Sequence, residues 1–128
     1  MNRKLAIGGS PKTDSEKLLL LVHRYSAVAD SVAHTNSPTI RQNDNLNAEA
    51  FRTEADTLSK DYPILRPPLA RIHLSLCELR ETAAKLTAET DWSDQQMFSD
   101  TNPCQRIWMM LQKQIADFDR LANLELGR

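Results

Sequence analysis

Apolar residues recur every three to four positions in four separate segments of the chain, with polar residues between them. This spacing places apolar side chains on one face of an α-helix. The segments that we expect to be helical span residues 13–34, 46–61, 69–90 and 102–126. We find no segment with the period of two that is typical of a half-buried strand. The pattern therefore predicts an all-α protein.

Capping residues or prolines mark where three of these helices begin. Thr13 and Glu16 fit a capping box, in which each side chain accepts a hydrogen bond from a backbone N–H at the helix start. Asn102 is a favourable N-cap residue, and a proline directly after it suits the first helical position. Pro67–Pro68 can lie in the first turn of the third helix, where the missing N–H groups have no helical partner to lose.

The lengths of the connections predict how the helices are arranged. Short or moderate connections leave neighbouring helices antiparallel, so we expect an antiparallel four-helix bundle, complete in one chain or completed by oligomerisation. Residues 1–12 are expected to form a tail, and residues 13–128 a single helical domain. The second helix has a thin apolar face, which is typical of a helix at the edge of a bundle.

The third helix has the strongest pattern, because its apolar residues keep a 3-4 spacing across three heptads. Such a stripe is typical of a core helix or of a seam between subunits. The residues that we expect at this interaction or oligomer seam are Leu69, Ile72, Leu76, Leu79, Ala83 and Leu86.

Length and composition exclude several classes of protein. A chain of 128 residues favours one domain, and three glycines are too few for a glycine-rich phosphate loop. A net charge of −1 excludes an overall basic nucleic-acid binder but allows a local basic patch. The longest uninterrupted apolar run is Leu18–Val22, far short of the roughly 20 residues of a membrane-spanning helix. We therefore expect a cytoplasmic protein that does not bind a membrane.

One pair of residues could carry metal chemistry. His73 and Cys77 are four positions apart, so both lie on one face of the third helix. A metal site needs two further ligands, and His23 and Cys104 could approach, although nothing in the spacing requires it. The more common interpretation is that Cys77 borders the core and that His73 is half exposed. With no recognisable catalytic or metal-binding motif, we expect no enzyme activity, no metal and no cofactor.

The C-terminal part of the chain resembles a known family. An Asn102–Pro103 helix start is followed by Leu111, Ile115 and Leu121, and the helix finishes in Glu-Leu-Gly at residues 125–127. This segment is similar to one found in phage terminase small subunits. The helix over 69–90 is similar in position to the central helix of that group, so the resemblance covers about half the chain.

The resemblance implies a non-enzymatic component of viral DNA packaging. Such proteins oligomerise through central helices, contact DNA and regulate a partner ATPase. The helix over 69–90 would then be the oligomer seam. Candidate phosphate contacts, taken from charge alone, would be Arg3, Lys4, Lys12 and Lys17.

Three functions follow from these patterns. The first is a small non-catalytic module for protein–protein interaction, adaptor or regulatory in role, that binds a protein partner or a second copy. The broad apolar stripes favour it, because they exceed what a single seam requires. The alternatives are the packaging subunit and a metal-binding or enzymatic bundle built around His73 and Cys77. No small-molecule substrate is indicated.

Overall fold

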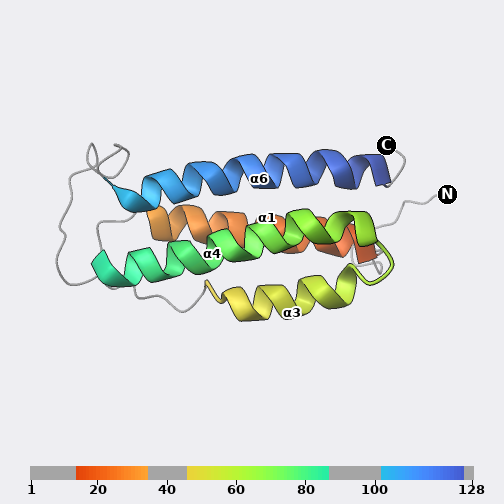
Figure 1. The fold of residues 1–128 in the computed structure, drawn as a ribbon, viewed down its shortest axis with the longest axis horizontal. Helices are drawn as coiled ribbons and strands as arrows, with labels where there is room; N and C mark the ends of the chain where they lie inside the picture. Colours follow the sequence, from red (N-terminus) through yellow and green to blue (C-terminus); the bar gives the residue numbers. More distant parts are fainter. Residues whose placement is uncertain (1–13, 35–45, 87–101, 126–128) are drawn as a thin grey trace.

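The computed structural model describes residues 14–34, 46–86 and 102–125, and within these ranges the protein is an all-α bundle (Figure 1). Its four α-helices are joined in one place by a short 3₁₀ helix, and none of the described residues lies in a strand. In chain order the elements are α1 (Asp14–Ala33), α3 (Ala48–Leu58), η2 (Pro63–Leu65), α4 (Arg66–Leu86) and α6 (Pro103–Glu125). The predicted fold class is confirmed.

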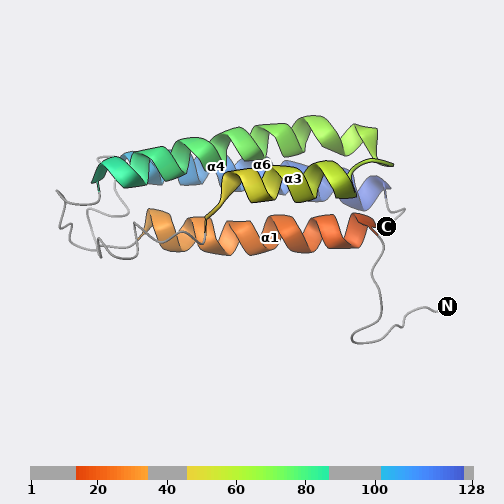
Figure 2. The same ribbon diagram turned by 90° about the horizontal axis from the view of Figure 1, so that it is seen from below.

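Successive helices run in opposite directions. Figure 1 shows α1 and α4 running one way along the bundle and α3 and α6 running the other way. The two views together place α3 and α6 on opposite sides of the α1–α4 pair (Figure 2). Helices α1 and α4 each pack against the three other helices, so this pair lies at the centre of the bundle.

The apolar stripe of α4 lies inside the monomer. Leu69, Ile72, Leu76, Leu79 and Ala83 are at most 4% exposed, because α1, α3 and α6 of the same chain cover them. Of the two possibilities that the sequence leaves open for this stripe, a core or a seam between subunits, the burial of these five side chains favours the core. The side chain of Leu86 lies outside the described residues.

Helix α3 is about half as long as its neighbours and ends earlier than the sequence predicts. It stops at Leu58, and the backbone N–H of Ser59 donates to the carbonyl of Ala55 at 2.9 Å. Pro63 disfavours helical backbone angles at Tyr62, whose φ of −131° and ψ of 66° lie outside the helical region. The chain therefore leaves the helix before the proline and makes the η2 turn.

One aromatic contact anchors α3 to the bundle. Phe51 is fully buried, and its ring meets that of Tyr25 on α1 edge-on, with the ring centres 5.2 Å apart. Edge-to-face packing of this kind adds to the free energy gained from burying the two rings. Helix α3, of 11 residues, is held along only part of the length of α1 and α4.

The predicted start of α6 and the predicted place of Pro67 and Pro68 in the first turn of α4 are confirmed, although α4 begins at Arg66, three residues before the expected span. Helix α4 carries Pro67 and Pro68 in its first turn. Helix α6 begins at Pro103, and Asn102 caps it by accepting a hydrogen bond from the backbone N–H of Cys104 at 2.9 Å. Asn102 also donates to the carbonyl of Ala33 at 3.1 Å, which joins the end of α1 to the start of α6. The predicted tail over 1–12, the Thr13 cap and the last turn before Gly127 lie outside the described residues.

Candidate functional site

A groove opens between α1 and α3, with a hollow of about 650 Å³. Its α1 side carries Leu20, which is 59% exposed although its neighbours Leu18 and Leu21 are buried. The residues that line the groove, four from each helix, are Lys17, Leu20, Leu21, Arg24, Thr53, Glu54, Thr57 and Leu58. We call this surface the α1–α3 groove.

The α1–α3 groove has an apolar floor between charged residues. Arg24 donates to Glu54 across the groove at 3.0 Å, and its guanidinium also lies over the Tyr25 ring. Lys17 is exposed and makes no ion pair with another described residue. The Arg24–Glu54 pair is neutral overall, so Lys17 leaves the groove with a net positive charge.

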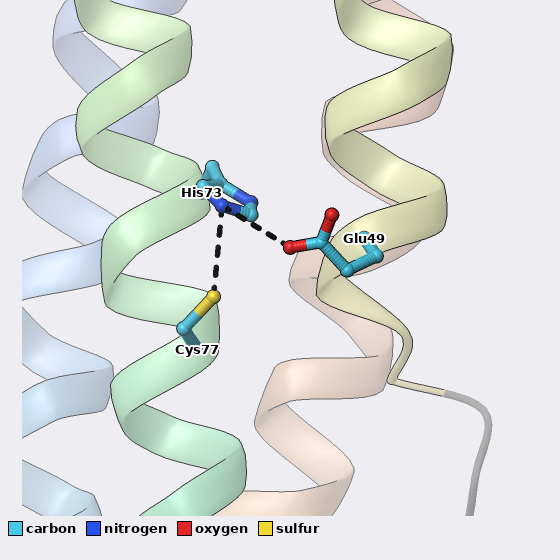
Figure 3. Close-up of side chains that lie close together, drawn as sticks. All are labelled: Glu49, His73 and Cys77. Atoms are coloured by element: carbon cyan, nitrogen blue, oxygen red, sulfur yellow. Dashed lines mark hydrogen bonds and ion pairs between the residues drawn. The ribbon is translucent and has the colours of Figure 1, made fainter.

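A second cluster forms where α3 begins beside the middle of α4. Glu49 of α3 lies opposite His73 and Cys77 of α4, and the three side chains point toward one another (Figure 3). The Nε2 atom of His73 lies 3.7 Å from Cys77 Sγ and 3.9 Å from Glu49 Oε2. Glu49 is exposed, while His73 and Cys77 are half-buried, as the sequence predicts for the latter two.

Hydrogen bonding orients the ring of His73. Its Nδ1 atom lies 3.1 Å from the carbonyl oxygen of Ala48, which can only accept a hydrogen bond. The Nδ1–H group is therefore the donor, and in the neutral ring the lone pair sits on Nε2 and faces Cys77 and Glu49.

Burial and negative charge favour the protonated form of Cys77. Burial raises the pKa of the thiol above its ordinary value, and the carboxylates of Glu49 and Glu81 raise it further. Arg80 and Arg52 act in the opposite direction and lower the pKa, but by less. The protonated thiol can donate to the Nε2 lone pair of His73, and it is a weak nucleophile in this state.

The structure separates the other residues that the sequence suggested for a metal site. His23 lies on the surface of α1, where its Nε2 atom is hydrogen-bonded to the Asp119 carboxylate of α6 at 2.9 Å. Cys104 is buried at the start of α6. Among the described residues neither joins His73 and Cys77. The sequence does not indicate the third member of the cluster, Glu49, because it lies on a different helix from His73 and Cys77.

Of the four candidate phosphate contacts, the structure describes Lys17 alone. It lies on the first turns of α1 and lines the α1–α3 groove. Arg3, Lys4 and Lys12 lie outside the described residues. A basic cluster that includes Lys17 is therefore still a prediction.

Comparison with protein-family models, with curated proteins and with solved structures finds no match to this chain. The resemblance to terminase small subunits therefore stays a prediction. None of the described helices is both long and apolar enough to cross a membrane.

Proposed function

We propose that this protein is a non-catalytic interaction module and that its α1–α3 groove binds an amphipathic helix with an acidic side chain. The observation that carries the proposal is the stripe of Lys17, Leu20, Leu21 and Arg24 beside the open face of α3. Their spacing of i, i+3, i+4 and i+7 is the spacing with which one helix packs on another.

The exposed fraction of Leu20 is what makes this stripe unusual. The buried leucines of α1 pack against other helices of the chain, whereas Leu20 leaves more than half of its surface in water. A partner that covers a leucine gains about 1.5–3 kcal/mol when the burial is complete. Leu58 on the α3 side is half-buried and extends the same apolar floor.

Charge and length limit the partner further. Because Lys17 has no ion pair with another described residue, an acidic side chain on the partner would complement the net charge of the groove. Helix α3, of 11 residues, is about 16 Å long, which matches roughly three turns of a partner helix. The partner is therefore a short helical segment with leucine-like residues on one face and an acidic residue beside them.

Selection from a random peptide library displayed on phage tests this proposal. We expect peptides that bind the full chain to be amphipathic and acidic. Leu20→Gln should weaken their binding about 10- to 100-fold, since each 1.4 kcal/mol changes affinity tenfold. Lys17→Glu should weaken it as well.

Leu74→Gln is the matched control. Leu74 is 65% exposed on α4 and does not line the α1–α3 groove, so this substitution should leave peptide binding unchanged. The proposal is wrong if no selected peptide depends on Leu20, or if the two glutamine variants bind equally well.

The mass in solution separates this proposal from the packaging subunit. The stripe of α4 is covered by the chain itself, so we expect a monomer of 14.5 kDa by light scattering at two protein concentrations. A discrete assembly of eight or more subunits would instead favour the packaging subunit. DNA binding that weakens steeply with salt would then be the next measurement.

A further inference from the structure

We infer that Glu49, His73 and Cys77 form a binding site for a divalent transition metal ion, with zinc the best fit to their donor atoms. The site uses α3 and α4 and shares no residue with the α1–α3 groove, so the two proposals stand independently. No metal was expected from the sequence, where only two ligands could be placed on one helix face.

The distances between donor atoms are close to those of a coordinated ion. The three donor atoms all lie within 4.8 Å of one another. Tetrahedral zinc with bonds of about 2.0–2.3 Å places its donor atoms roughly 3.3–3.6 Å apart. The two separations from His73 Nε2, 3.7 Å to sulfur and 3.9 Å to oxygen, therefore need only small rotations of exposed or half-buried side chains.

The hydrogen bond of His73 prepares the ring for a metal. Metal-bound histidines commonly donate their second ring N–H to a carboxylate or a backbone carbonyl, which sets the tautomer and the ring orientation. The bond from Nδ1 to the Ala48 carbonyl is of this kind, and it directs the Nε2 lone pair at the other two ligands.

The donor set selects the class of ion. One nitrogen, one sulfur and one oxygen suit zinc and other first-row divalent ions, whereas Mg²⁺ and Ca²⁺ prefer oxygen donors alone. An ion that binds here replaces the hydrogen of the Cys77 thiol, and the proton leaves to solvent. The resulting thiolate and the Glu49 carboxylate then balance the two positive charges of the ion.

The open side of the cluster leaves room for a fourth ligand. A hollow of about 300 Å³ lies against Glu49 and Cys77 and is lined by Arg80 and Glu81 as well. Three protein ligands with one open position is the arrangement in which zinc keeps a water molecule or takes up an external ligand. We therefore place a water molecule at the fourth position.

Titration of the full chain with CoCl₂ under reducing conditions tests the site, because Co²⁺ reports its ligands in the absorption spectrum. We expect one equivalent to bind, with the d–d bands of four-coordinate Co²⁺ and a thiolate-to-cobalt charge-transfer band. ZnCl₂ should then displace the cobalt and abolish both signals. Absence of the thiolate band at one equivalent would overturn the inference.

Substitutions assign the three ligands. Cys77→Ser should abolish the charge-transfer band. Glu49→Gln should keep the band but weaken binding by at least the roughly 10- to 100-fold that loss of a supporting residue causes. Both side chains are partly exposed, so both variants should keep the helical circular dichroism of the wild type. Cys77→Ser and Glu49→Gln therefore test the proposed metal site even if the variant of the third ligand, His73→Gln, does not fold.

The other cysteine and an exposed histidine provide controls. Cys104→Ala and His23→Gln should bind cobalt like the wild type, because neither residue belongs to the cluster. A charge-transfer band that survives Cys77→Ser, or an affinity that Glu49→Gln leaves unchanged, would show that this three-ligand site is wrong.

Discussion

Leu76→Asp is expected to unfold the bundle. Leu76 is fully buried on α4, which packs against each of the three other helices. Loss of a buried leucine side chain alone costs about 2–5 kcal/mol, and a buried carboxylate without a partner adds several more. A domain of this size has a free energy of unfolding of about 5–15 kcal/mol, so the sum approaches the whole stability. Urea unfolding followed by circular dichroism should show no cooperative transition.

Leu74→Asp is the matched control for this prediction. It lies two residues earlier on the same helix, and 65% of its surface is exposed. The new carboxylate stays in water there, so the free energy of unfolding should change by no more than about 0.5 kcal/mol. If Leu76→Asp keeps the unfolding midpoint of the wild type, the assignment of the buried face of α4 is wrong.

Asn102→Ala is expected to lower the free energy of unfolding by about 2–4 kcal/mol. Removal of a capping side chain costs about 1 kcal/mol. Asn102 is also buried, and its amide donates to the Ala33 carbonyl. Loss of that donor removes a hydrogen bond from the end of α1 in a buried setting, which adds about 1–3 kcal/mol. Chemical denaturation of the variant and the wild type measures the difference.

Asn47→Ala separates the contribution of a helix cap from that of the hydrogen bond between two helices. Asn47 caps α3 by accepting a hydrogen bond from the Ala50 backbone N–H at 3.0 Å, but it is exposed and makes no hydrogen bond to any other helix among the described residues. We therefore expect a loss of about 1 kcal/mol, the value of a cap alone. Equal losses for the two variants would mean that the bond between Asn102 and α1 adds nothing to stability.

Helix starts were predictable because the residues that cap a helix lie next to it in the chain. Asn102 meets the backbone N–H of Cys104 two residues later, and Pro67 and Pro68 lie in the first turn of α4. The apolar faces were predictable for a similar reason, since a period of 3.6 residues sets which side chains share a side of a helix. The end of α3 was predicted three residues too late, because the turn over 59–62 competes with a further helical turn.

The sequence does not predict which surface the apolar face of each helix packs against. A heptad stripe identifies the side of α4 that avoids water, but the same stripe serves a core within one chain and a seam between two chains. The burial of Leu69, Ile72 and Leu76 by other helices of the chain decides for the core. On α1, the apolar run does not reveal that Leu20 alone among its leucines is mostly exposed.

The sequence by itself determined that this chain forms four amphipathic helices, where most of them begin, and that His73 and Cys77 share one face of α4. These features depend on neighbours within a few positions, and local backbone geometry sets them. Only the tertiary structure placed Glu49, which precedes His73 by 24 positions in the chain, against that pair, and opened a groove between α1 and α3. Both arise because packing brings together faces of different helices, and no spacing along one helix encodes which faces meet.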